Sequence, residues 1–370
     1  MHNVVDMGGG DRAPKTERVL CILPFAKPTA ILDELLRKHP NIEITYLERS
    51  IAEGLKRESV DQTIYLDKTI LVTLTALPES REDSPKLEVV HLFSAGSERV
   101  QKSKLFLETD ITFTTSSGVH GPQIAEWVVM TALVHSHHFK GLYELQKQRR
   151  WAREGPYNNF QQVRDLAGQR LAILGYGSIG RQVARVGKAL GMTVLAYTAS
   201  KKDTPEKRRD DGYIVPGTGD PDGSIPSEWH SGTSKEELHA FLSADVDILV
   251  VSVPLTPATR HMLSRDEFAA LGKRKAFVAN IARGPIIDQP ALVEALKEGT
   301  LRGAAVDVTE PEPLPSDDPL WDAPNVTITP HISGSGSNYA ERAFGVLEVN
   351  LERREKGEPL INVIDRKKGY

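Results

Sequence analysis

The chain has 370 residues, a formal net charge of −4 and a single cysteine, Cys21. This length is enough for two domains, and the weak negative charge provides no basic field that would attract nucleic acid. One cysteine excludes a disulfide within the chain, so we expect a reducing compartment, the cytoplasm, and a buried thiol. No apolar run reaches the length of a bilayer span, so we expect no membrane partner, and residues 1–15 are predicted to be a disordered leader.

The first third of the chain alternates apolar runs with amphipathic ones. Strands are predicted over residues 18–25, 41–48, 69–75 and 87–93, and a helix over residues 30–36. Strands separated by helices indicate a parallel sheet covered on both faces. Two glycines and a proline then break the pattern over residues 114–123, which we interpret as a hinge.

The remaining chain repeats this alternation and predicts a second α/β domain. It begins with one long helical stretch over residues 124–148 and ends with a helix over residues 338–355, which we expect to pack on the first domain. Residues 215–233 are dense in Gly, Pro, Ser and Asp and are interpreted as a long surface loop. Further strands are predicted over residues 192–198, 246–255, 275–282, 302–308 and 325–330.

The run LAILGYGSIGRQ, residues 171–182, places Gly175, Gly177 and Gly180 at G-x-G-x-x-G spacing after a predicted strand. The first glycine allows a tight turn, the second lets the backbone approach a pyrophosphate, and the third lets the helix pack on the strand. Free N–H groups at the start of that helix would hold the phosphates. The helix is predicted to end at Gly191 and to have an apolar face made of Ile179, Val183, Val186 and Leu190.

The segment after the next strand indicates which dinucleotide binds. NAD sites usually hold Asp or Glu there for the ribose 2′-hydroxyl, but here no acid occurs between Thr198 and Asp203. Thr198 and Ser200 can donate hydrogen bonds to a 2′-phosphate, and Lys201 and Lys202 add positive charge. The sequence therefore predicts NADP(H) as the preferred cofactor, with NAD(H) as the alternative.

Three later motifs place reactive side chains just after predicted strands. Arg283 lies in VANIARGPIIDQPAL, and His331 lies in VTITPHISGSG. Asp307, Glu310 and Glu312 lie in GAAVDVTEPEPLP between them. Because parallel α/β sheets bind ligands at the carboxyl ends of their strands, we expect an arginine, an acid and a histidine to converge beside the nicotinamide.

In this order, these motifs resemble those of the D-isomer-specific 2-hydroxyacid dehydrogenases, together with FSAGSERV and VSVPLTPATRHML. The resemblance implies two parallel-sheet α/β domains, Rossmann-like and flavodoxin-like, with the cofactor domain inserted into a discontinuous substrate domain. We therefore expect the substrate domain to comprise residues 16–118 and 337–370 and the cofactor domain residues 119–336. The family also implies a homodimer, with Trp151 packed at its interface, and a small 2-oxo or 2-hydroxy acid as substrate.

The resemblance implies a role for each catalytic residue. Arg283 would clamp the substrate carboxylate and polarise the 2-oxo group, and His331 would be the acid and base. Glu312, rather than Glu310, would pair with that histidine, because the family places this acid five residues after the aspartate that Asp307 matches. Such chemistry suits these residue types, since hydride addition to a ketone leaves an alkoxide that needs a proton donor.

The resemblance also implies the contacts to substrate and cofactor. Backbone N–H groups of Ser94, Ala95 and Gly96 would bind the substrate carboxylate. Asp307 would lie near the nicotinamide carboxamide. The remaining cofactor contacts are assigned to Gly175, Gly177, Ser178, Ile179, Gly180, Thr198, Ser200, Lys201, Lys202 and Pro254.

Three alternatives accompany this interpretation. The corepressors of the C-terminal binding protein type share the fold and the Arg–Glu–His set and act as nucleotide-dependent scaffolds. Formate dehydrogenases are also similar, but they carry Gln where Glu312 stands. His135 and His138 lie at helical spacing and suggest a metal, yet no further ligand joins them and the family needs none, so we expect no metal site. The NADPH-type strand end favours a glyoxylate/hydroxypyruvate reductase.

Overall fold

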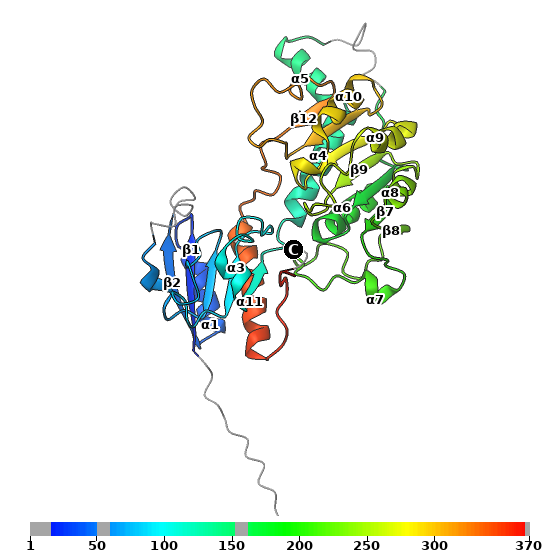
Figure 1. Ribbon diagram of the computed structural model, residues 1–370. Helices are drawn as coiled ribbons and strands as arrows, with labels where there is room; N and C mark the ends of the chain where they lie inside the picture. The colour runs from blue at the N-terminus through cyan, green and yellow to red at the C-terminus, as the bar shows by residue number, and fades with distance from the viewer. Residues whose placement is uncertain (1–15, 50–59, 152–161, 367–370) are drawn as a thin grey trace, which may run out of the picture. The chain divides into compact units, whose positions relative to one another are not determined.

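The computed structural model describes residues 16–49, 60–151 and 162–366, and the predicted leader over residues 1–15 lies outside them. The chain divides into two units, Met1–Ser116 with Ala340–Tyr370 and Ser117–Tyr339 (Figure 1). In the described part of the chain, no helix combines the length and the hydropathy needed to cross a bilayer.

The first unit contains a parallel five-stranded sheet in the order β2-β1-β3-β4-β5. Its strands are β1 (Glu17–Leu23), β2 (Ile42–Glu48), β3 (Ile70–Thr73), β4 (Val89–Leu92) and β5 (Thr112–Thr115). Its α-helices are α1 (Thr29–Lys38), α3 (Lys104–Glu108) and most of α11 (Tyr339–Glu355). The final helix packs through Phe344, whose ring centroid lies 5.0 Å from that of Phe93.

Cys21 lies in the buried centre of β1. Burial raises the pKa of its thiol to about 12, which keeps the sulfur protonated and unreactive. The prediction of a buried structural thiol is therefore confirmed.

The second unit contains a parallel seven-stranded sheet in the order β12-β11-β10-β9-β6-β7-β8. Its strands are β6 (Arg170–Leu174), β7 (Thr193–Thr198), β8 (Glu228–Ser231), β9 (Ile248–Val251), β10 (Phe277–Asn280), β11 (Gly303–Val306) and β12 (Val326–Ile328). Its α-helices are α4 (Gly121–Ser136), α5 (Phe139–Lys147), α6 (Ser178–Ala189), α7 (Pro205–Arg208), α8 (Lys235–Leu242), α9 (Arg265–Leu271) and α10 (Gln289–Lys297). Two parallel-sheet α/β domains confirm the predicted fold class.

Both faces of the second sheet are covered, which explains why its strands are continuously apolar. Leu249 and Val251 of β9 face a core shared with α8, α9 and α10. Ile248 and Val250, the alternate residues of the same strand, face a second core shared with α4 and α6.

The long helix predicted over residues 124–148 is wrong, because two helices occupy that stretch. The first, α4, ends at Ser136, and His138 then adopts a left-handed backbone with φ 54° before α5 begins. His135 and His138 therefore do not share a helix face. Burial lowers the pKa of His135 to about 4, and its ring packs 5.0 Å from that of Phe277. His135 is thus a neutral packing residue.

The predicted surface loop over residues 215–233 is also wrong in part, because β8 lies within it and pairs in parallel with β7 at the sheet edge. The strand reads Glu-Trp-His-Ser, and such a polar, half-buried edge strand has no apolar run by which to recognise it. Asp220 holds the preceding turn. It is only 3% exposed and accepts hydrogen bonds from Tyr176 Oη at 2.7 Å and from the backbone N–H groups of Ser224 and Ile225.

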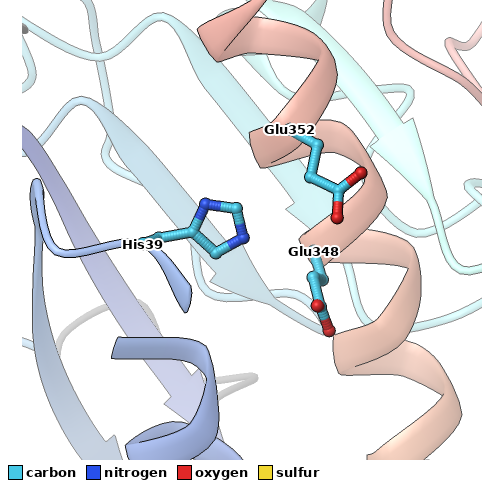
Figure 2. A group of neighbouring side chains, drawn as sticks. All are labelled: His39, Glu348 and Glu352. Carbon is cyan, nitrogen blue, oxygen red and sulfur yellow. The ribbon is translucent and has the colours of Figure 1, made fainter. Parts of the chain in front are cut away.

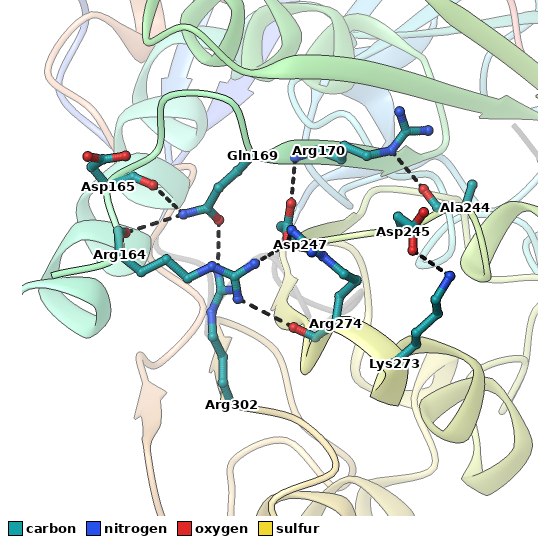
Figure 3. A network of polar contacts seen from close by, with 10 residues as sticks. All are labelled: Arg164, Asp165, Gln169, Arg170, Ala244, Asp245, Asp247, Lys273, Arg274 and Arg302. Carbon is teal, nitrogen blue, oxygen red and sulfur yellow. Dashed lines mark hydrogen bonds and ion pairs between the residues drawn. The ribbon is translucent and has the colours of Figure 1, made fainter. Parts of the chain in front are cut away.

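A charged network closes the amino end of the second sheet (Figure 3). Asp247, fully buried before β9, accepts hydrogen bonds from Arg170 N at 2.9 Å and Arg274 Nε at 3.0 Å, and it pairs with Arg164. Burial lowers the pKa of the neighbouring Arg302 to about 10, and its Nη2 donates to Gln169 Oε1 at 3.1 Å. The network ties the starts of these strands together.

Candidate active site

The glycine-rich turn between β6 and α6 has room only for glycine at two of its three positions. Gly175 has φ +101°, and a Cβ there would lie 2.8 Å from the carbonyl carbon of Ser252. A Cβ on Gly180 would lie 2.5 Å from the Gly175 oxygen, so this glycine lets α6 approach the strand. No described atom lies within 4 Å of a Cβ placed on Gly177. The turn is therefore tight on the protein side and open at the glycine expected to face a phosphate.

The first turn of α6 offers its N–H groups at Ser178, Ile179 and Gly180 and contains no acidic residue. Ile179 packs against the core under the helix, as expected. Leu190 does not lie on the apolar face predicted for it, because the helix ends at Ala189 and Leu190 is 38% exposed. Ser252, which the sequence reasoning missed, donates its Oγ to the Gly175 oxygen at 2.7 Å, and exposed Pro254 follows it.

The end of β7 is basic. Thr198 Oγ1 donates to the Ser200 oxygen at 2.8 Å, and Lys201 is exposed. The nearby acid, Asp203, is bound by Lys207 Nζ at 2.8 Å, which lowers the pKa of the carboxyl group. This pairing neutralises the one carboxylate in the 198–203 run.

Arg208 is a further cation beside this segment that the sequence reasoning missed. Its Nε donates to the Lys202 oxygen at 2.9 Å, and its guanidinium lies 5.4 Å from the centre of the Trp229 ring. The basic run in α7 is the sequence signal that points to it.

Arg283 follows β10 in an extended conformation and is half-buried. Its Nη1 donates to the Ala282 oxygen at 2.7 Å, and Asn280, 1% exposed, donates Nδ2 to the Arg283 oxygen at 3.2 Å. A Cβ on the next residue, Gly284, would lie 1.9 Å from the Thr309 oxygen. This glycine therefore allows the arginine turn to pack directly on the loop after β11.

Glu312 and His331 form a direct pair. His331 Nδ1 lies 2.6 Å from Glu312 Oε1, which leaves Nε2 on the other side of the ring. Both side chains are substantially exposed, 50% for the histidine and 39% for the glutamate, so a small molecule can reach the pair. Glu310 instead contacts Arg260 Nη1 and His261 Nε2, each at 2.6 Å, and the bond to His261 is the main reason that the pKa of Glu310 is lowered.

Asp307, 2% exposed after β11, is bound on both carboxylate oxygens by the turn that carries the histidine. Its Oδ1 accepts from Thr329 Oγ1 at 2.5 Å and Ile332 N at 2.9 Å, and its Oδ2 accepts from Ser333 Oγ at 2.5 Å and Ser333 N at 2.9 Å. The backbone oxygen of Asp307 also accepts a hydrogen bond from the backbone N–H of His331 at 2.8 Å. These bonds hold His331 in its left-handed conformation, φ 54°. A contact from Asp307 to the nicotinamide stays a prediction.

The loop expected to bind the substrate carboxylate belongs to the first unit. Ser94 Oγ donates to the Gly96 oxygen at 2.7 Å, and Ser116 N donates to the Ser94 oxygen at 2.9 Å. Ala95, between them, is exposed. Neither bond uses the N–H groups of Ser94, Ala95 and Gly96.

Comparison with known proteins places this chain in a family. Residues 129–215 and 220–333 match the family described as D-isomer specific 2-hydroxyacid dehydrogenase, NAD binding domain. The chain is 30% identical over 324 residues to D-3-phosphoglycerate dehydrogenase of Methanocaldococcus jannaschii. The match covers 86% of this chain but only 55% of that protein. It is 32% identical over 284 residues to hydroxyphenylpyruvate reductase of Plectranthus scutellarioides, covering 76% and 79% of the two chains.

The fold comparison agrees. The NADPH-dependent glyoxylate/hydroxypyruvate reductase of Sinorhizobium meliloti, solved with NADP and sulfate, superposes with a TM-score of 0.69 at 26% identity. The match covers 96% of this chain and all of that one. The chain is an enzyme that uses a nicotinamide cofactor and acts on 2-hydroxy or 2-oxo acids, and it belongs to the D-isomer specific 2-hydroxyacid dehydrogenase family.

Proposed function

We propose that this enzyme reduces a small 2-oxo acid to the D-2-hydroxy acid with NADPH as the preferred cofactor, and catalyses the reverse reaction. The observation that carries the proposal is the pair of His331 and Glu312, 2.6 Å apart and accessible, at the carboxyl edge of the dinucleotide-binding sheet. The proposal is supported by a fingerprint turn that leaves space at Gly177.

His331 holds and moves the proton. Its Nδ1–H donates to the Glu312 carboxylate, which fixes the ring orientation and stabilises the imidazolium. Nε2 then carries the proton that goes to the carbonyl oxygen as that oxygen becomes an alkoxide. In the reverse direction, neutral Nε2 accepts the hydroxyl proton. Bound NADPH would supply the hydride.

Arg283 orients the substrate. A guanidinium has five N–H donors in a planar fork that matches a carboxylate, and one of them is used on the Ala282 oxygen. Such a fork suits the substrate carboxylate and the 2-oxo group beside it. We also propose that the N–H groups of Ser94, Ala95 and Gly96 bind the substrate carboxylate.

Preference for NADPH is supported by charge. An acid at the end of β7 would repel a 2′-phosphate, but Asp203 is already paired with Lys207 at 2.8 Å. Lys201, Lys202 and Arg208 leave the segment positive. The Ser200 hydroxyl can donate to a phosphate, and the Thr198 hydroxyl can do so when it releases the Ser200 oxygen to which it donates here. The Sinorhizobium meliloti reductase, which is similar in fold, is described as NADPH-dependent.

We also propose that the enzyme is a homodimer through the region around α5. Apolar side chains lie exposed there, and such patches mark association surfaces. Their exposed fractions are 54% for Phe139, 40% for Leu142, 47% for Tyr143 and 90% for Trp151. Light scattering should give twice the chain mass, and a Tyr143→Glu variant should shift toward the monomer. The cytoplasmic location stays a prediction.

The test of function is loss of reduced-nicotinamide absorbance against glyoxylate, hydroxypyruvate, pyruvate, a branched 2-oxo acid and phenylpyruvate, with NADPH and with NADH. Turnover with NADPH and a lower KM for it than for NADH support the proposal. Equal KM values overturn the cofactor preference. Absence of turnover on all five acids, with NADPH still bound, overturns the proposal of a small 2-oxo acid substrate and favours a bulkier substrate or the scaffold role of the corepressor type.

A further inference from the structure

Three metal-ligating side chains meet in the first unit, outside the site described above. His39 follows α1, and Glu348 and Glu352 lie one turn apart on α11, so both carboxylates share a helix face. Their ligand atoms all lie within 4.8 Å of one another. Figure 2 shows the histidine ring directed at the face of α11 that carries both carboxylates.

His39 is the observation that points to a ligand. Its side chain is 3% exposed, and its Nε2 is buried without a hydrogen-bond partner among the described residues. Leaving a buried polar atom unpaired is unfavourable, so native proteins seldom keep one without a reason. The other ring nitrogen, Nδ1, is bound to Glu355 Oε1 at 2.8 Å.

In metal sites one imidazole nitrogen commonly binds the ion while the other donates its N–H to a carboxylate, and the surroundings of His39 allow this arrangement. We propose that His39 Nε2, Glu348 and Glu352 bind a Zn²⁺ ion, with Glu355 as the residue that orients the imidazole. An imidazole with two carboxylates suits Zn²⁺, with water as a fourth ligand, whereas Mg²⁺ and Ca²⁺ prefer oxygen alone.

The geometry needs only small side-chain movements. Tetrahedral ligands about 2.0–2.1 Å from zinc lie about 3.3 Å from one another, against the 4.8 Å span observed here. Glu352 is 49% exposed, so it can rotate toward His39 without disturbing the core. The bound ion would fasten α11 to the end of α1.

Lys38 competes with the ion. Its Nζ lies 2.6 Å from Glu348 Oε1, and the lysine side chain is 41% exposed. An exposed pair of this kind contributes little and can open, and the second carboxylate oxygen of Glu348 is available to the metal. Removing the lysine charge should therefore strengthen zinc binding. If the Lys38–Glu348 pair had only a structural role, its removal would have no such effect.

The experiment uses the full chain, freed of metal by a chelator and titrated with zinc chloride in a calorimeter. We expect one Zn²⁺ per chain at this site, and a melting temperature that rises by roughly 5 °C when free zinc reaches about 100 times Kd. Glu352→Gln should weaken binding by about 10-fold or more, and Lys38→Gln should tighten it. Glu341→Gln removes the same charge from the first turn of α11 and should change nothing.

His39→Gln should abolish zinc binding at this site. If that variant fails to fold, Glu352→Gln provides the test. Co²⁺ in place of zinc should give visible bands that Glu352→Gln alters. The proposal is overturned by absence of stoichiometric binding. It is equally overturned when Glu352→Gln binds zinc as tightly as Glu341→Gln, because the zinc then occupies another site.

Discussion

Asp307→Asn separates a positioning role for this residue from direct contact with the cofactor. In the wild type, Oδ1 accepts from the backbone N–H of Ile332 and Oδ2 from that of Ser333. An asparagine has only one side-chain oxygen, so whichever way the amide is turned, one of these N–H groups faces an NH2 donor.

The magnitude follows from the bonds lost. One buried N–H left unpaired costs about 1–3 kcal/mol, and replacing a charged acceptor by a neutral one weakens the remaining bonds by a similar amount. Together these losses amount to about 2–6 kcal/mol on the turn that holds His331. Since a displacement of about 1 Å can cost about 100-fold in rate, we expect kcat to fall by about 10²–10³-fold.

The assay is steady-state reduction of the best 2-oxo acid, with NADPH affinity measured separately by quenching of protein fluorescence. A positioning role predicts a large loss in kcat and an unchanged Kd for NADPH. The control Asp317→Asn, at an exposed residue in the following loop, should show no loss in kcat. A raised Kd for NADPH with little change in kcat would refute this reasoning and favour a direct contact with the nicotinamide.

Three further predictions concern other parts of the chain. His331→Ala should lower turnover by about 10²–10⁴-fold with NADPH binding intact, whereas the control His137→Ala, at an exposed residue, should leave turnover unchanged. Wild-type turnover in His331→Ala would refute the role of His331 as the acid and base. Lys202→Glu should raise the KM for NADPH by about 10-fold and leave that for NADH nearly unchanged, because only the first carries the 2′-phosphate; equal changes for both cofactors would contradict it. Burial lowers the pKa of His91 to about 4, against about 6.5 unfolded, so its contribution to stability is complete above about pH 6.5 and is lost as the pH falls toward 4. Urea unfolding should show that loss, up to about 3 kcal/mol, and His91→Gln should flatten it; an equal slope in both proteins would show that other groups are responsible.

The features that could be predicted from the sequence share a physical cause. Strands buried on both faces must be apolar throughout, so β6 and β9 are visible as runs of apolar residues. The glycines of the fingerprint are visible because a side chain at Gly175 or Gly180 would overlap the backbone.

The features that were missed depend on contacts rather than on pattern. The break at His138 is a single left-handed residue, and β8 is a polar edge strand. The positioning role of Asp307 rests on which groups bind its two oxygens, and a spacing of residues does not contain that information. The juxtaposition of His39 with Glu348 likewise arises only when α11 packs on the first unit.

The most direct test of the central claim is single-turnover reduction of glyoxylate or hydroxypyruvate by the enzyme preloaded with NADPH, comparing wild type with Glu312→Gln. We expect rapid oxidation of NADPH in the wild type, formation of the D-2-hydroxy acid, and a rate at least about 10-fold lower in the variant, because its His331 lacks the carboxylate that stabilises the imidazolium. Equal single-turnover rates in the two proteins would contradict the assignment of the His331–Glu312 pair as the proton donor.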